Sequence, residues 1–288
     1  MTVPRTDLWS HAPRTVLRAG PGTDLATLDR ASTPGWSGNR KAAESRLAAT
    51  GERMSELQER LYAHGRSDGT RSVLLLIQGM DTAGKGGLVR HVVGMVDPQG
   101  VALRSFGVPT EEERTHDYLW RIRNALPRPG YLGVFDRSHY EDVLVARVEN
   151  LVPQDVWEQR YDEINAFEAE VVASGTTLVK VMPVVSPDEQ AARLRERLTR
   201  PDKYWKYSPG DIDVRAKWAE YEAAYQAVLD RTSTDVAPWY VVPADRKWYA
   251  RMAVAELLLR ALEDLDLDWP AADFDPEVEL ARLDATKV

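Results

Sequence analysis

The chain has 288 residues, with 37 Lys and Arg against 45 Asp and Glu, so its formal net charge is −8. Apolar residues make up 43% and charged residues 28%, which is the composition of an ordinary globular protein. The absence of cysteine excludes disulfides, a cysteine nucleophile, thiolate metal sites and iron–sulfur clusters. The acidic balance weighs against a nucleic-acid partner, and no apolar run reaches the roughly 20 residues of a membrane span. We therefore expect a cytoplasmic protein with no nucleic-acid or membrane partner.

The predicted elements fall into three stretches of chain. Residues 1–40 are rich in Gly, Pro, Ser and Thr and predict an N-terminal arm or extended wrap. Residues 41–270 predict one domain that begins with a helix over 41–64, and residues 271–288 form an acidic C-terminal tail. Strands are expected at Val73–Gln78, Val101–Phe106, Tyr131–Phe135, Thr176–Val185 and Trp239–Val242. Further helices are expected at Thr110–Ala125, Asp155–Ala173, from Ser186 onward, Asp213–Asp230 and 246–262.

Strand and helix alternate five times along this domain. That pattern predicts an α/β fold of three layers, in which helices cover both faces of a five-stranded parallel sheet. Ligands of such sheets bind at the carboxyl ends of the strands. The residues that directly follow each strand are therefore the first place to look for chemistry.

A glycine-rich loop follows the first predicted strand. The spacing of Gly79, Gly84 and Lys85 matches the phosphate-binding pattern GxxxxGK, in which backbone N–H groups and the lysine surround a phosphate. Gly86 stands where the usual Ser or Thr would ligate magnesium, and Gly87 follows it. Asp81, inside the loop, is the candidate to hold a cation there instead, because an acid in a phosphate cradle would otherwise repel the phosphate. A glycine-rich turn with no ligand is the structural alternative.

The third predicted strand leads directly into Asp136 and Arg137. An apolar strand that ends in Asp commonly supplies the second magnesium contact of a phosphotransferase, and the adjacent arginine can contact a phosphate or pair with an acid. The alternative is an ordinary turn, because Asp often starts one. For His139 we expect a packing or hydrogen-bonding role, since a phosphate acceptor is already an anion and needs no general base.

Residues 193–217 are basic in an acidic chain, with eight Lys or Arg against four Asp or Glu. Arg193 and Arg197 are four residues apart and share a helix face. Pro201 and Ser208-Pro209-Gly210 interrupt the helix, so that Lys203, Trp205 and Lys206 lie in a loop that can be mobile. The segment is interpreted as a lid that closes over a polyanion, and the alternative is a solvated helix face.

Three stretches together resemble the polyphosphate kinase 2 family of polyphosphate:nucleotide phosphotransferases. They are Gly79–Gly87 (GMDTAGKGG), Phe135–Val145 (FDRSHYEDVLV) and Pro201–Lys206 (PDKYWK) before Ser208–Asp211. The resemblance covers about residues 40–265. It implies a thymidylate-kinase-like P-loop kinase fold with a helical lid, a Mg²⁺ cofactor, inorganic polyphosphate and AMP or ADP as substrates, and a homo-oligomer.

The resemblance also implies residue roles. Asp81 and Asp136 match the family's paired acids near the metal, and Lys85 matches its phosphate cradle together with Gly79, Gly84, Gly86 and Gly87. The basic positions around the phosphates are matched by Arg137, Arg193, Arg197, Lys203 and Lys206. The nucleotide side is matched by Arg121, Tyr140 and Glu141. The stretch from His139 to Val145 is most similar to members that accept both AMP and ADP.

Two other functions stay open at this point. One is an ATP-dependent nucleoside monophosphate kinase on the same fold, which would ignore polyphosphate as a donor. The other is a P-loop protein that binds a nucleotide or polyphosphate without catalysis, which the lack of Ser or Thr at position 86 mildly favours. Complete acid and lid sets argue against simple binding, because binding alone needs neither.

Overall fold

The computed structural model describes residues 8–286, so residues 1–7 of the predicted arm and 287–288 of the predicted tail lie outside the described residues. The strands are β1 Ser72–Ile77, β2 Val101–Ser105, β3 Leu132–Asp136, β4 Thr176–Val184 and β5 Trp239–Pro243. They form one parallel sheet in the order β2-β3-β1-β4-β5. The predicted five-stranded parallel sheet is therefore confirmed, with each strand boundary within one residue or so of the prediction.

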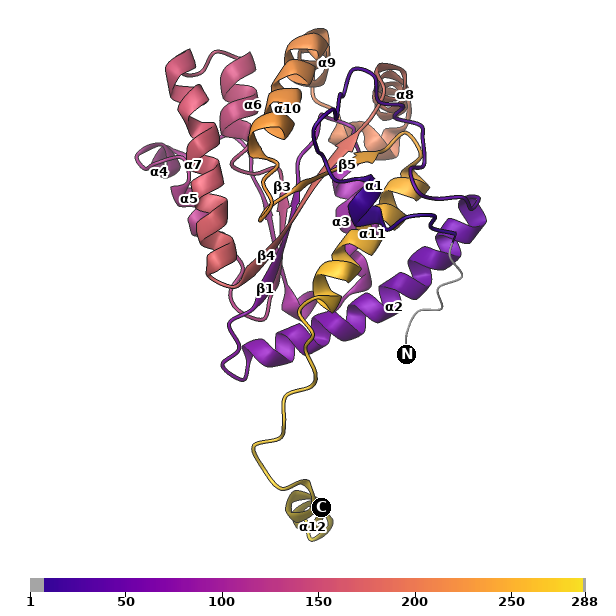
Figure 1. Ribbon diagram of the computed structural model, residues 1–288, viewed down its shortest axis with the longest axis vertical. Helices are drawn as coiled ribbons and strands as arrows, with labels where there is room; N and C mark the ends of the chain where they lie inside the picture. Colours follow the sequence, from indigo (N-terminus) through magenta and orange to yellow (C-terminus); the bar gives the residue numbers. More distant parts are fainter. Residues whose placement is uncertain (1–7, 287–288) are drawn as a thin grey trace.

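The helices cover both faces of the sheet (Figure 1). The longer α-helices are α2 Arg40–Gly65, α6 Glu141–Val148, α7 Gln154–Ala173, α8 Pro187–Thr199, α10 Trp218–Thr232, α11 Lys247–Glu263 and α12 Pro276–Asp284. The short helical segments are α1 Pro13–Val16, α3 Lys85–His91, η1 Val93–Met95, η2 Pro98–Gly100, α4 Glu111–Arg114, α5 Trp120–Arg123, η3 Pro201–Lys206 and α9 Gly210–Ala216. No helix among residues 8–286 is long and apolar enough to span a membrane.

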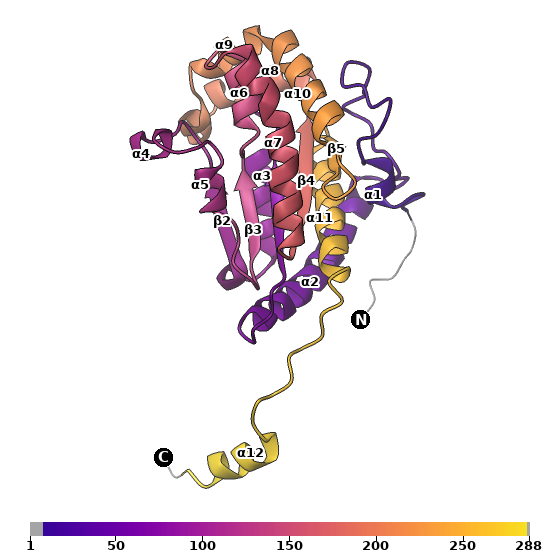
Figure 2. The ribbon, with the colours of Figure 1, turned by 60° about the vertical axis from the view of Figure 1, so that its left-hand side comes forward.

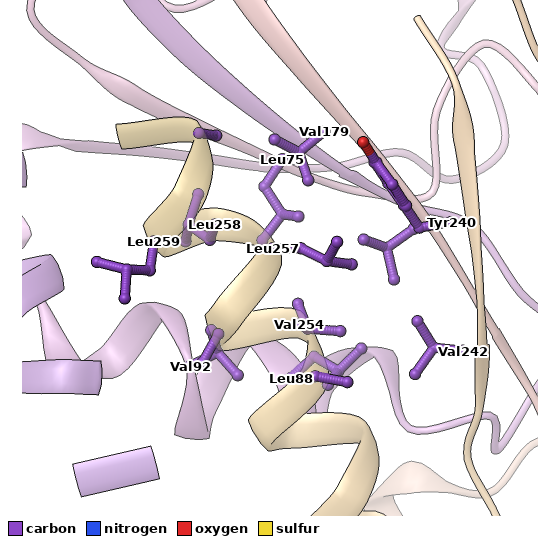
Figure 3. Close-up of a cluster of buried hydrophobic side chains, with 14 of the residues drawn as sticks. Leu75, Leu88, Val92, Val179, Tyr240, Val242, Val254, Leu257, Leu258 and Leu259 are labelled. Atoms are coloured by element: carbon purple, nitrogen blue, oxygen red, sulfur yellow. The ribbon is translucent and has the colours of Figure 1, made fainter. Parts of the chain in front are cut away.

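Each face of the sheet has its own apolar core. On one face, β1, β4 and β5 pack against α2, α3 and α11, and Figure 3 shows Val254 and Leu257 of α11 near Leu88 of α3 and Val92, the residue after α3. On the other face, α6, α7 and α10 pack against the alternate residues of the same strands. β1, β3, β4 and β5 are largely buried because successive side chains point to opposite faces and helices cover both faces, whereas the edge strand β2 is mostly exposed. This rigid sandwich fixes where the carboxyl ends of the strands lie.

The N-terminal segment wraps the sheet edge next to β5. Ala19 N–H donates to the Trp239 carbonyl and Val241 N–H donates to the Leu17 carbonyl, each at 2.8 Å. Trp9 and Trp36 are both buried and pack edge to face, 5.3 Å between ring centroids. The segment thus covers an edge whose backbone groups would otherwise be unpaired.

The C-terminal residues leave the body after α11. The backbone carbonyl of Asp268 accepts a hydrogen bond from His64 of α2 at 2.7 Å, and the guanidinium of Arg60 lies 5.8 Å from the centre of the Trp269 ring. Beyond it, α12 stands apart from the sandwich in both ribbon views and has no buried residue (Figures 1 and 2).

Two helix predictions are wrong in detail. The predicted helix Thr110–Ala125 is two short helices, α4 and α5, because the Asp117 carboxylate accepts the N–H of Leu119 and turns the chain between them. The capping box of Thr110 with Glu113 is present as expected. The predicted helix Asp213–Asp230 begins earlier, at Gly210, and breaks at Lys217.

Candidate active site

The loop after β1 is folded around the side chain of Lys85. The Lys85 ammonium donates to the carbonyls of Gly79 at 2.6 Å and Met80 at 3.2 Å. Gly84 has φ +105° and Thr82 has φ +65°, the left-handed conformation that curls the loop. Burial lowers the pKa of Lys85 in spite of the carboxylate of Asp81. The lysine therefore places a positive charge at the base of the site, and its hydrogen bonds to two carbonyls stabilise the loop.

Asp81 projects from this loop between two cations. Its Oδ1 accepts a hydrogen bond from Arg137 Nη2 at 2.9 Å and lies 3.8 Å from Lys85 Nζ. Burial raises the pKa of Asp81, but the charges of Lys85 and Arg137 outweigh burial and hold the pKa below its ordinary value. Asp81 is thus an anion when the site is empty, which is the state that a divalent cation requires.

Asp136 ends β3 beside Ile77, the last residue of β1. Its carboxylate makes no hydrogen bond or ion pair with any other residue in the range 8–286, although it lines the same cavity as Asp81 and Lys85. Arg137 has φ +66°, and its N–H donates to the Ile77 carbonyl at 3.0 Å. The strained turn fixes the direction of both side chains, with Arg137 aimed at Asp81 and Asp136 left open.

The segment 193–217 lies over the carboxyl ends of the strands as α8, η3 and α9 (Figure 1). Where the sequence suggested a loop, residues 201–206 form the 3₁₀ helix η3. Lys203 lies 2.5 Å from Glu196, and the ammonium of Lys206 lies 4.9 Å from the centre of the Trp205 ring, whose side chain is exposed. These contacts give the segment a defined shape, and four of its basic side chains line the cavity, namely Arg193, Arg197, Lys203 and Lys206.

Arg193 and Arg197 hold the lid segment to the rest of the site. Arg193 is 7% exposed and donates to the carbonyls of Thr82 at 2.7 Å and Ala244 at 2.6 Å. Arg197 donates to the Lys206 carbonyl at 2.9 Å and to Asp211 at 3.0 Å. Both arginines border the cavity, but their hydrogen bonds show that they also brace the phosphate loop and the lid.

A large cavity of about 880 Å³ opens between the phosphate loop and the lid. Its cations come from α3, the turn after β3, α8, η3 and α11, and they outnumber its acids. The lining charged residues are Asp81, Lys85, Arg90, Asp136, Arg137, Arg193, Glu196, Arg197, Lys203, Lys206, Asp211 and Lys247. Gly84, Gly86 and Gly87 line it as well, whereas Gly79 lies at its back and lines other cavities. A cavity with this surface suits a long polyanion.

A second cavity of about 360 Å³ lies on the other side of Asp81 and Arg137, which line both cavities. Its wall is mixed, with apolar, aromatic and charged groups. The lining includes Met80, Val108, Arg121, Glu141, Asp142, Val145, Glu149, Val214 and Tyr221. A small cavity that combines apolar walls with a few charged groups suits a small polar molecule.

Arg121 and Glu141, both predicted on the nucleotide side, line this second cavity. Arg121 donates to the Gly107 carbonyl at 2.9 Å and lies 3.6 Å from Asp142. Glu141 accepts a hydrogen bond from Gln78 at 2.5 Å. Each charged group is thus positioned by a neighbouring loop or strand end.

Tyr140, predicted on the nucleotide side, lines neither of these two cavities. Its side chain is fully buried, and its hydroxyl donates to Glu168 at 2.7 Å and accepts from Lys180 at 2.9 Å. Burial raises the pKa of Tyr140, with the Glu168 carboxylate adding to the effect. His139 is also buried and hydrogen-bonds Glu168, which matches the packing and hydrogen-bonding role expected for it.

Several lining residues escaped the sequence analysis. Lys247 follows β5, so the rule that ligands meet the ends of strands could have found it. Arg90 lies on α3, past the recognised motif, and Tyr221 lies on α10, far along the chain from the phosphate loop. Nothing in their local sequence marks either of them, because only the packing of α3 and α10 brings them to the site.

The fold and the site define a P-loop phosphotransferase, with a phosphate loop, two acids at strand ends and a basic lid. A family model, "Polyphosphate kinase 2 (PPK2)", matches residues 37–269. The chain belongs to the polyphosphate kinase 2 family.

Known relatives support this membership over most of the chain. A Meiothermus ruber protein named "AMP/ADP-polyphosphate phosphotransferase" is 46% identical over 247 residues, which is 86% of this chain and 91% of the relative. A Rhodopseudomonas palustris protein named "ADP-polyphosphate phosphotransferase" is 41% identical over 231 residues, 76% of this chain and 78% of the relative. The crystal structure of polyphosphate kinase 2 from Arthrobacter aurescens matches with a TM-score of 0.94 and 51% identity, covering 96% of this chain and 98% of that one.

Proposed function

We propose that this protein transfers the terminal phosphoryl group of inorganic polyphosphate to AMP and ADP, and that the reaction is reversible. The observation that carries the proposal is the meeting of two unlike cavities at Asp81 and Arg137. One cavity is large and basic, and the other is small with a mixed wall. The name of the Meiothermus ruber relative supports polyphosphate with both AMP and ADP, and that of the Rhodopseudomonas palustris relative supports polyphosphate with ADP.

Polyphosphate is assigned to the large cavity. Its cations from the phosphate loop, α3, the lid and α11 can surround a chain of phosphates without being specific for a base or a sugar. Lys203 and Lys206 are placed along the phosphate chain, while Arg193 holds the phosphate loop and the end of β5 in register. The reacting phosphoryl group is placed at the Asp81 end, because Asp81, Gly107 and Arg137 line both cavities.

The nucleotide is assigned to the smaller cavity. Its apolar residues offer a surface for a flat base, and Arg121 offers a cation for the acceptor phosphate. Glu141 and Glu149 are positioned to accept hydrogen bonds from the nucleotide. The same arrangement allows a monophosphate or a diphosphate as the acceptor, provided that its terminal phosphate reaches Arg137.

The two site acids fit Mg²⁺. Mg²⁺ is usually held by one or two carboxylates, with substrate phosphates and water as its other ligands. Asp81 and Asp136 face one cavity, and the Asp136 carboxylate is unpaired among the described residues. Within residues 8–286 there is no group of three or more His, Cys, Asp or Glu that could hold a metal by itself. When bound, Mg²⁺ would neutralise phosphate charge and polarise a phosphoryl oxygen.

The residues act by position and charge. Lys85 and Arg137 lie on either side of Asp81, so they face the negative charge that spreads over the migrating phosphoryl oxygens. Arg137 bridges the phosphate loop and the loop after β3, which keeps donor and acceptor in line. No side chain has to remove a proton, because the attacking phosphate of AMP or ADP is already an anion.

The test is a transfer assay without ATP. Purified protein, Mg²⁺ and long-chain polyphosphate are mixed with AMP or ADP in separate tubes, and the nucleotides are separated by anion exchange. We expect AMP to give ADP and then ATP, and chelation by EDTA to stop the reaction until Mg²⁺ is restored. If phosphate moves only when ATP is the donor, the protein is a nucleoside monophosphate kinase and the proposal fails.

Two further expectations from the sequence stay predictions. They are the homo-oligomer and the cytoplasmic location. The first is measured by sedimentation of the purified protein, and the second by fractionation of the source cells.

A further inference from the structure

A row of basic side chains continues from the large cavity across the outer surface of α3 and α11. Arg90, His91 and Arg251 make no side-chain hydrogen bond or ion pair with any other residue in the range 8–286. Leu88 of α3, the following Val92 and Val254 of α11 turn toward the core (Figure 3). Beside them, Arg90 is exposed and His91 and Arg251 are half-buried.

The row is continuous with the cavity. Arg90 and Lys247 line the cavity itself. Arg251 is one helical turn beyond Lys247 on α11, about 6 Å further along the helix axis. Arg40, the first residue of α2, is the next cation in this direction and influences Arg251 electrostatically. A chain that leaves the cavity beside Lys247 would therefore meet further positive charge.

The charges of the row act on one another. Burial lowers the pKa of Arg251, and the charges of Arg40, Arg193 and Arg90 lower it further, against Glu44. Burial also lowers the pKa of His91, with Arg251 and Arg90 adding to the effect. Glu44 is already paired with Arg40 at 2.7 Å. These cations repel one another, and few carboxylates nearby offset that repulsion. A bound anion would reduce it, so the row favours binding of a polyanion.

We propose that Arg90, His91 and Arg251 form a distal subsite for the part of a polyphosphate chain that extends beyond the catalytic cavity. This inference rests on the proposed function, because it concerns the same donor substrate. A repeating anion suits the site, since each phosphate of the chain is equivalent and can occupy any of the three contacts. The subsite would make affinity depend on chain length, because a short donor ends inside the cavity and never reaches Arg251.

The test compares two donors by isothermal titration calorimetry, with Mg²⁺ and without nucleotide. The donors are long-chain polyphosphate and tripolyphosphate. We expect Arg251→Gln to raise the Kd for long-chain polyphosphate about two- to five-fold, the size of one exposed charge contact, and to leave the affinity for tripolyphosphate much less affected. Arg90→Gln/Arg251→Gln should lower long-chain affinity further, and the long-chain effect should shrink at high salt.

The control is Arg260→Gln, which removes the same charge from the same helix, at a position paired with Glu263 rather than with the row. Arg251→Lys keeps the charge and should retain the affinity for long-chain polyphosphate. That result would show that the affinity lost in Arg251→Gln is not caused by misfolding. An equal rise in Kd for both donors, or no rise with long-chain polyphosphate, overturns the distal subsite. Failure of the unmodified protein to bind or use any polyphosphate overturns the proposed function instead.

Discussion

Arg137 donates a hydrogen bond from Nη2 to Oδ1 of Asp81 across 2.9 Å, and this contact joins the two loops that bound the site. Asp81 belongs to the loop after β1, whereas Arg137 follows β3. The two strands are neighbours in the sheet, so their carboxyl ends are fixed relative to each other. The other side of the Arg137 guanidinium faces Glu141, 3.9 Å away, at the entrance of the smaller cavity. One side chain therefore links the donor side to the acceptor side.

Arg137→Lys should lower kcat about 10- to 100-fold with little change in stability. A lysine keeps the positive charge, but its single ammonium cannot contact Asp81 and Glu141 at the same time as the planar guanidinium does. Small displacements of groups at a reacting centre lower the rate strongly. Steady-state kinetics with polyphosphate and ADP measure the effect. Arg123→Lys is the matched control, because Arg123 forms an exposed pair with Glu170 at 2.9 Å. Equal kinetics for the two variants would contradict the linking role.

Asp136→Asn should lower turnover about 100- to 1,000-fold while the protein stays folded. The carboxylate faces the large cavity without a partner among the described residues, so its loss removes no internal contact. Turnover and far-ultraviolet circular dichroism are compared with those of Asp162→Asn, a surface position on α7. Near-normal turnover in Asp136→Asn would rule out the assigned site.

Arg193→Gln should weaken both stability and substrate binding. The buried guanidinium satisfies the carbonyls of Thr82 and Ala244, and unpaired buried acceptors cost about 1–3 kcal/mol. The released phosphate loop should also raise the KM for polyphosphate. Urea unfolding and kinetics measure the two effects.

Arg195→Gln, two residues along the same helix at an exposed position, is the control for Arg193. Arg195→Gln should change neither the free energy of unfolding nor the KM for polyphosphate appreciably. A stable Arg193→Gln protein with unchanged KM would show that the bridge to Thr82 does not shape the loop.

The buried pair of Glu168 and Lys180 should make stability depend on acid pH. Burial alone would raise the pKa of Glu168, but the Lys180 ammonium, 2.6 Å away, outweighs it and holds the pKa below its ordinary value of 4.5. The carboxylate thus stabilises the fold above pH 4.5, and this contribution is lost as pH falls from there through the lowered pKa. Breaking such a pair by Glu168→Gln should cost about 3–5 kcal/mol near neutral pH.

Urea unfolding at several pH values between neutral and about pH 3 tests the pair. The slope of stability against pH should be flatter for Glu168→Gln than for the unmodified protein. Glu170→Gln, exposed on the same helix, should keep the unmodified slope. If Glu168→Gln does not fold, Glu168→Met/Lys180→Met replaces both charges by apolar groups and should also flatten the slope. Identical slopes in all variants would show that the pair does not control acid stability.

Much of the site follows from sequence because strand ends can be located. Asp136 and the Gly79–Gly87 loop lie at the carboxyl ends of two apolar runs, and parallel strands bring those ends together. That Arg137 could pair with an acid is expected from its sequence position, but the choice of Asp81 as its partner depends on the left-handed turn at residue 137. The cavity residues on α3, α10 and α11 also depend on how the helices pack.

Tyr140 and Glu141 show that the sequence does not predict which way adjacent side chains point. They are adjacent and share one motif, yet Glu141 lines the smaller cavity while Tyr140 points into the core. The reason lies far along the chain, where Glu168 of α7 and Lys180 of β4 offer hydrogen bonds to the Tyr140 hydroxyl. A motif of alternating polar and aromatic residues does not say which face of the following helix each one takes.

Gly86 and Gly84 are adjacent to Lys85 on either side but should respond oppositely to alanine. A Cβ at Gly86 would meet no atom within 4 Å, so Gly86→Ala should stabilise α3 by about 0.5–1 kcal/mol. Gly84 has φ +105°, so Gly84→Ala should cost about 1–2 kcal/mol. The open space at Gly86 faces the large cavity, and a phosphate in that space would collide with the new methyl group. Gly86→Ala should therefore raise the KM for polyphosphate while raising stability, as measured by kinetics and urea unfolding. A stabilised protein with unchanged KM would place the donor chain away from this face of the loop.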